Sequence, residues 1–198
     1  MVDMYSRLTI SCFIERKKPE EVINKLMEKW IGYFGVMRFL LNDNGGEFTA
    51  EEVREVKDIL NVVDLTTGAE SPWQNGLCEK NHHTVDVMLE RLVEDYPKTP
   101  EETLLAWANM AKNSMQNIYG FSPNQLVFGT NPNLPNIMTD GLPALDGKTS
   151  SEVFAHHMNA LHASRKAFIE SESSERIRRA LRRNVSTVNR VWCHGDIV

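Results

Sequence analysis

The stretch VMRFLLNDNGGEFTAEEVREVKDILNVVDL, residues 36–65, decides the fold class. It opens with an apolar run at 36–41 that predicts a buried strand, and this run stops at a turn made of Asn, Asp and Gly. Thr49 and Glu52 then have the spacing of a capping box, and the apolar positions behind them predict a helix. The stretch ends in a second short strand at 62–65. A strand, a helix and a strand in close succession favour a layered α/β fold.

Patterns on both sides of this stretch extend the α/β prediction. Apolar and polar residues alternate over 8–14, as in a strand, and apolar residues recur at helical spacing over 19–34 before Gly35 ends the helix. Two more helices are predicted at 77–96 and 99–120, the second capped by its opening Thr-Pro-Glu-Glu and ended by its final glycine. We therefore expect a sheet with helices packed on it.

The C-terminal third of the chain has a different composition. Pro and Asn are frequent over 131–143, which predicts a domain boundary. Beyond Ser150 the pattern predicts a long polar helix whose apolar residues are too sparse for a thick core, and we interpret it as a linker helix. This helix leads into a basic run over 176–190 with no acid and six arginines, namely Arg176, Arg178, Arg179, Arg182, Arg183 and Arg190.

The distribution of charge matters more than its total. The 198 residues have a net charge of −5, which by itself argues against nucleic-acid binding, because neutralising phosphates requires surplus Lys and Arg. Residues 1–175, however, carry 16 bases and 26 acids, so the positive charge is concentrated in the arginine run. That run could hold a polyanion while the acidic body supplies metal-binding carboxylates, although a solvated basic helix face explains the run equally well.

Several classes of protein are excluded by composition. No apolar run approaches the roughly 18 residues that span a bilayer, and the chain does not start like a signal peptide. We expect neither a membrane protein nor a signal-directed secreted one. Three widely spaced cysteines give no disulfide framework, so we expect a reducing compartment. The adjacent histidines at 82–83 and 156–157 lack the spacing of a zinc finger.

Asp43 and Glu79 are the acids best placed for chemistry. Asp43 follows a predicted strand at a glycine turn, and Glu79 lies in the first turn of a helix after a loop rich in Gly, Pro and Asn. Two such carboxylates can hold a divalent metal that activates water or a hydroxyl for phosphoryl displacement. From the residues alone a simpler alternative stays open, in which Asp43 serves the turn and Glu79 complements the helix dipole.

Four short sequences occur in order along the chain: VDMYSR at 2–7, NDNGGEF at 42–48, SPWQNGLCEK at 71–80 and SPNQLVFG at 122–129. Together they closely resemble the catalytic core of the integrases of retroviruses and long-terminal-repeat retrotransposons. The two acids agree with this resemblance, since they are separated by 35 residues, the interval of the family's D,35-E signature. The resemblance covers about residues 1–136.

The resemblance implies an RNase H-like fold, a mixed sheet of five strands flanked by helices, with a carboxylate triad that holds two Mg²⁺ or Mn²⁺ ions. It implies trimming of the 3′ ends of element DNA followed by strand transfer. Asp43 and Glu79 would be the second and third members of the triad. Asp3 matches the family's second strand, so we assign it to strand and turn structure. The first triad Asp, its strand and the family's zinc module are then missing from this chain.

The resemblance also suggests a division into domains. Residues 1–136 would be the N-terminally truncated catalytic core, and residues 137–190 the linker with its basic helix. The final VWCHGDIV, residues 191–198, is similar to the first strand of the small SH3-like barrel that follows the core in these integrases.

Candidate DNA-binding residues lie in two parts of the chain. Gln74 and Asn75 lie in the loop before Glu79, where an ordinary polar turn is the alternative to DNA contact. Lys80 and His83 lie on the helix that carries Glu79, and a solvated helix face is the alternative for each. The remaining candidates belong to the basic run: Arg178, Arg179, Arg182 and Arg183.

The leading hypothesis is an incomplete retroelement integrase core, a metal-dependent polynucleotidyl transferase whose partners are element DNA, target DNA and further copies of the chain. Its substrate would place it in the nucleus. A second hypothesis is a catalytically inactive module that binds DNA or protein, because two carboxylates without the first Asp should bind metal poorly. An RNase H-like nuclease of another family fits the fold but not the SPWQNGLCEK sequence.

Overall fold

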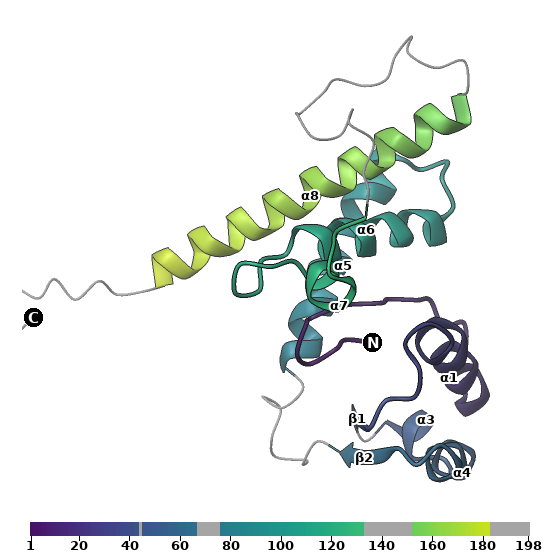
Figure 1. The fold of residues 1–198 in the computed structure, drawn as a ribbon. Helices are drawn as coiled ribbons and strands as arrows, with labels where there is room; N and C mark the ends of the chain where they lie inside the picture. Colours follow the sequence, from purple (N-terminus) through teal and green to yellow (C-terminus); the bar gives the residue numbers. More distant parts are fainter. Residues whose placement is uncertain (44, 67–75, 133–151, 183–198) are drawn as a thin grey trace, which may run out of the picture.

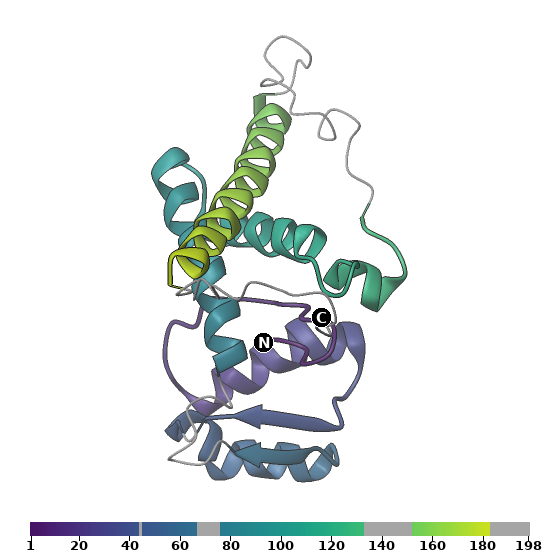
Figure 2. The same cartoon turned by 90° about the vertical axis from the view of Figure 1, so that its left-hand side faces the viewer.

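A computed structural model describes residues 1–43, 45–66, 76–132 and 152–182 (Figure 1). Three helices, α5 (Gly76–Asp95), α6 (Glu101–Met115) and α8 (Glu152–Arg182), form a helical layer, and β1 (Phe39–Asn42) and β2 (Val63–Thr66) form a short sheet. The sheet lies on the far side of α1 (Pro19–Leu26) from the helical layer (Figure 2). The mixed α/β fold predicted from sequence is confirmed. Among the described helices, none is long and apolar enough to cross a membrane.

The hydrophobic core lies in the helical layer. The sparse apolar positions of α8 are sufficient to pack, because Ala160, Ala167 and Phe168 are buried against α5 and α6. The long helix predicted beyond Ser150 is confirmed, and its N-terminal part is packed rather than free. The core of this layer is made of small and large apolar side chains: Val85, Met88, Leu92, Leu104, Leu105, Ala108, Ala111, Ala160, Ala167 and Phe168.

The helix predicted at 19–34 is present with one irregularity. α1 begins at Pro19, as the sequence predicts, and continues through a π-helical segment, Met27–Ile31, into the short α2, Gly32–Phe34. Gly35 ends the helix with φ +78°, a left-handed conformation that glycine adopts without steric cost.

β1 and β2 pair in parallel, with Phe39 opposite Val63 and Asn42 opposite Thr66. Both strands occur where the sequence predicts them, within one to three residues at their ends. The prediction that the first strand is buried is wrong, since Phe39 is 54% exposed and the described residues place no strand on the other edge of β1. α3 (Gly46–Thr49) and α4 (Glu51–Ile59) connect the two strands.

The strand predicted at 8–14 is wrong, because this segment forms only one bridge, between Val2 and Thr9. Side chains of α6 take the place of a neighbouring strand. The backbone N–H of Thr9 donates to Asn113 Oδ1 (2.9 Å), and Asn113 Nδ2 donates to the Thr9 carbonyl (2.7 Å). Asn109 holds Ser11 in the same way, at 3.2 and 3.1 Å. Asn109 and Asn113 are four residues apart on a helix, a rise of about 6 Å, and Thr9 and Ser11 are two residues apart in an extended segment, a rise of about 6.7 Å. The two amides are therefore spaced to reach both residues.

The predicted helix caps are wrong. Ala50 and Pro100 precede α4 and α6, and neither helix start has a side-chain cap. The hydroxyl of Thr49 bonds to carbonyls of the preceding turn, and that of Thr99 pairs with His156 Nε2 on α8. These tertiary and local partners compete with capping.

α6 ends at Met115, five residues before Gly120, where the sequence predicts its end. Gly120 has φ +95° and lies in the turn that leads to α7 (Pro123–Phe128). A complete capping box is found at α7 instead, between Ser122 and Gln125.

Candidate active site and nucleic-acid interface

Asp43 directly follows β1 and is exposed. Its Oδ1 accepts a hydrogen bond from the backbone N–H of Gly45 at 3.2 Å. A Cβ placed on Gly45 would lie 3.1 Å from Asp43 Oδ1 and 2.9 Å from Glu47 Oε2, so the two carboxylates approach the same point beside Gly45. Glu47 is therefore an acid beside Asp43 that sequence reasoning did not select, although it lies in the same motif.

A polar network supports the end of β1. Asn42 Nδ2 donates to Asp64 Oδ1 at 2.6 Å, and Lys57 Nζ lies 2.9 Å from Asp64 Oδ2. Lys57 is buried and also donates to the carbonyl of Phe48 at 3.3 Å, so it connects α4 with β2 and the end of α3. The carboxylate of Asp64 is neutralised by Lys57, and its role is to fix the strand that presents Asp43.

Glu79 lies in the first turn of α5 and is exposed, as are Lys80, His83 and Asp86. His82 Nε2 lies 3.7 Å from Asp86 Oδ1, so the carboxylate of Asp86 is close to the ring of His82. The N-terminal end of α5 extends from the helical layer toward the sheet in both views (Figures 1 and 2). The opposite face of the helix is anchored by buried residues: Asn81, Thr84, Val85, Met88 and Leu92.

The basic part of α8 meets the N-terminal end of α5. Lys80 Nζ lies 3.5 Å from Glu175 Oε1, and Arg179 Nη2 contacts the same oxygen. Partial burial raises the pKa of the Glu175 carboxyl, but the hydrogen bond from Arg179 and the charge of Lys80 outweigh it and hold the pKa below its ordinary value. Two of the predicted DNA-binding residues, Lys80 and Arg179, are thus brought together, and Arg178 is exposed on the same stretch of helix.

Some predicted residues lie outside the described part of the chain. These are Gln74, Asn75, Arg183 and the segment 191–198. Arg182 is the last residue of α8, and its side chain is also outside the described residues.

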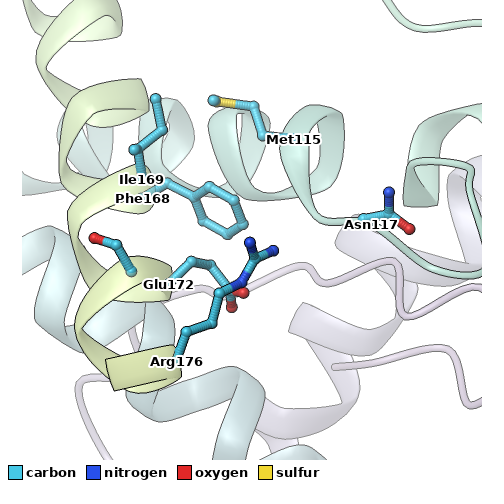
Figure 3. Close-up of a pocket in the computed structure, with 7 residues that line it drawn as sticks. Met115, Asn117, Phe168, Ile169, Glu172 and Arg176 are labelled. Carbon is cyan, nitrogen blue, oxygen red and sulfur yellow. The ribbon is translucent and has the colours of Figure 1, made fainter. Parts of the chain in front are cut away.

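A pocket of about 300 Å³ opens where α8 passes the C-terminal end of α6 (Figure 3). Glu172 lines this pocket and affects the buried amine of Lys112. The pKa of Lys112 is lowered to about 7, because burial lowers it more than the negative charge of Glu172 raises it. None of the site residues predicted from sequence lines this pocket, which places it apart from the candidate interface. Its lining consists of Met115, Asn117, Phe168, Ile169, Glu172, Ser173 and Arg176.

The arrangement of elements matches solved integrases. A chain of the simian T-cell lymphotropic virus intasome, solved in complex with the PP2A regulatory subunit B56γ, superposes with a TM-score of 0.59, 21% identity and coverage of 70% of this chain and 52% of that one. The chain has the fold of a retroviral integrase catalytic core. The HTLV-2 integrase core in complex with magnesium, in a trimeric form, gives a TM-score of 0.54 at 21% identity, with coverage of 63% of this chain and 79% of that one.

Sequence relatives agree with this integrase-core fold. The chain is 24% identical over 123 residues to the retrovirus-related Pol polyprotein from transposon 412 of Drosophila melanogaster, a match that covers 62% of this chain. The chain spans only 10% of that polyprotein's length. No family model matches the sequence.

The described residues do not by themselves fit the divalent-metal centre that the resemblance implies. Nowhere in the described ranges do three or more His, Cys, Asp or Glu side chains come together in a way that could hold a metal ion. Asp43 and Glu79 lie on separate elements, and Asp64 is paired with Lys57. Asp3 accepts hydrogen bonds from the N–H and hydroxyl of Ser6, at 2.7 and 2.6 Å, which agrees with its assignment to a turn.

Proposed function

We propose that this chain is the core segment of a retroelement integrase and that it serves in 3′-end processing and strand transfer of DNA. The observation that carries the proposal is the integrase-core fold, with Asp43 at the end of β1 and Glu79 at the start of α5. These are positions from which a rigid scaffold presents acids to a large substrate. Because the chain spans a small part of its polyprotein relatives, the activity of the whole protein belongs to this proposal.

The proposed roles follow from position. Asp43 and Glu79 would hold Mg²⁺ or Mn²⁺, together with a further carboxylate that the described residues do not bring to them. Lys80, His83 and the arginines of α8 would contact DNA phosphates. Gln74 and Asn75 would contact DNA beside Glu79. Partners would be element DNA, target DNA and further copies of the chain, since related cores are described in dimeric and trimeric forms. The site of action would be the nucleus.

A second candidate function is a catalytically inactive module that binds DNA or protein through the same fold. It is favoured by the described residues, which bring no three metal-ligating side chains together. Turnover distinguishes the two candidates. An enzyme joins DNA and loses this activity when Glu79 is changed, whereas a binding module has no such activity to lose.

The test is Mn²⁺-dependent nicking and strand joining on labelled duplex DNA that carries element ends, comparing the chain with its Glu79→Gln variant. We expect little or no joining, because the described residues bring no third carboxylate to Asp43 and Glu79, and equal DNA binding by both proteins. Activity that disappears in Glu79→Gln would establish the enzyme and contradict our expectation that the metal site is incomplete. If neither protein binds DNA, the proposed integrase function is wrong, and so is the second candidate as a module that binds DNA.

A further inference from the structure

Lys80 and Arg179 come from helices far apart in sequence, yet both point their cationic groups at one carboxylate oxygen. Lys80 Nζ lies 3.5 Å from Glu175 Oε1, and Arg179 Nη2 contacts that same atom. An anionic oxygen at this position therefore contacts both cations at once. The three side chains are 46%, 58% and 36% exposed for Lys80, Arg179 and Glu175, so the position can be reached from solvent.

The fold does not depend on this ion pair for stability. Exposed salt bridges contribute about 0–1 kcal/mol, and here they compete with hydration of all three groups. Without Glu175, two positive charges from α5 and α8 would face the same point with no anion between them. A phosphodiester oxygen carries the negative charge that this point requires. The guanidinium of Arg179 suits a phosphate, because its donors form a planar fork that can bond two phosphate oxygens at once.

The surroundings favour a nucleic-acid backbone as the occupant. The basic run begins at Arg176, directly after Glu175, and carries six arginines and no acid through residue 190. Arg178 is exposed on the same stretch of α8 as Arg179. A backbone that enters at Lys80 and Arg179 would pass directly beside Glu79, the neighbouring residue of α5.

We infer that Lys80 and Arg179 form one composite phosphate-binding site for DNA, and that Glu175 fills this site until a phosphate displaces it. This inference rests on the proposed function, in that it requires the chain to bind DNA. Glu175 then has two effects: it orders the two cations in a binding geometry, and it lowers the affinity for DNA by competing with phosphate.

A matched control is available on the same helix. Glu170 Oε2 lies 2.5 Å from Arg91 Nη1 of α5, so Glu170 also joins α8 to α5 through an exposed ion pair. Lys166 Nζ lies 4.0 Å from the other oxygen, Oε1, so the two cations at Glu170 do not meet at one oxygen. Glu170→Gln and Glu175→Gln change the net charge equally. Any general electrostatic gain in DNA affinity is therefore common to both variants, and only Glu175→Gln opens the proposed site.

The experiment is fluorescence anisotropy of a labelled duplex DNA of arbitrary sequence, without divalent metal, over a series of salt concentrations. We expect Glu175→Gln to bind about fivefold more tightly than the original chain, and Glu170→Gln less than twofold. Lys80→Ala and Arg179→Ala should each weaken binding and reduce the slope of log K against log salt by up to about one, since each loses a phosphate contact. In the Lys80→Ala background, Glu175→Gln should lose most of its gain.

The outcomes separate the inference from the proposed function. If the original chain binds DNA and the two glutamine variants bind equally, the composite site is wrong while DNA binding stands. If Glu175→Gln gains affinity to the same extent with and without Lys80, the two cations do not share a phosphate, and the inference is again overturned. If no protein in the series binds DNA at low salt, the proposed function fails together with the inference.

Discussion

In the helical layer Met88, Leu92 and Leu104 are completely buried, whereas in the sheet Phe39 is 54% and Val63 49% exposed. Parallel strands are normally covered on both faces, so the sheet is the less protected region. The two candidate catalytic carboxylates divide between these regions, because Asp43 follows β1 and Glu79 lies on α5. Apolar packing therefore positions Glu79, while the position of Asp43 depends on polar contacts.

The largest expected effect tests where the stability lies. Leu92→Ala should lower the free energy of unfolding by about 3 kcal/mol, because it leaves a cavity in a filled core. Leu65→Ala in β2 should lower it by less than about 1 kcal/mol, since that side chain already contacts water. Urea denaturation of both variants measures the difference. Equal losses would contradict the comparison between the two regions.

Polar contacts join the N-terminal segment to α6 of the helical layer, and their contribution to stability can be measured. Asn113→Ala removes the partners of the buried N–H and C=O of Thr9, and we expect a loss of about 2 kcal/mol. Asn109→Ala, at the more exposed pair with Ser11, should cost about half as much. The same denaturation experiment checks this order. If neither change matters, the two amides do not substitute for a strand.

The buried amine of Lys112 predicts a pH dependence of the helical layer. Burial lowers its folded-state pKa to about 7, below the ordinary value of 10.5. Between these values the unfolded chain binds more protons than the folded one, so stability should rise with pH, by about 2 kcal/mol from pH 7 to pH 9. The penalty is fully present below pH 7. Unfolding measured across this range should show the rise in the original chain and lack it in Lys112→Met.

A small effect is expected in the polar network of the sheet. Asp64→Asn removes the negative charge 2.9 Å from the buried amine of Lys57, and Asp64 is partly exposed, so we expect a loss of about 1 kcal/mol. Hydrogen exchange should accelerate at β1 and β2 and stay unchanged at α5. Asp58→Asn, an exposed change on α4, is the control. Faster exchange throughout the chain would mean that the two regions unfold as one unit.

Helices were predictable from sequence where apolar residues recur with helical periodicity. The helix of 77–96 and the long helix beyond Ser150 both occur, since apolar residues on neighbouring turns of a helix lie close together in the sequence. The cap at Thr99 and the strand at 8–14 were not predictable, because they depend on partners elsewhere: Thr99 pairs with His156 of α8, and Thr9 and Ser11 pair with amides of α6. A local sequence pattern does not indicate partners that are distant along the chain.

For the candidate site, the motifs singled out Asp43 and Glu79 and placed each at the end of a regular element. They did not indicate the support for Asp43, because the pairing of Asp64 with Lys57 requires β2 and α4 to pack together. Glu175 had a readable signal, since it precedes Arg179 by four residues on a helix. Its contact with Lys80 had none.

The sequence by itself determined the places of the longer helices and of β1 and β2, the interval between Asp43 and Glu79, and the concentration of positive charge after residue 175. These are properties of neighbouring residues and of composition. The tertiary structure decided that Lys80 and Arg179 meet at one oxygen and that Lys112 is buried. The physical reason is that such contacts arise from the packing of α8 on α5 and α6, which joins residues distant along the chain.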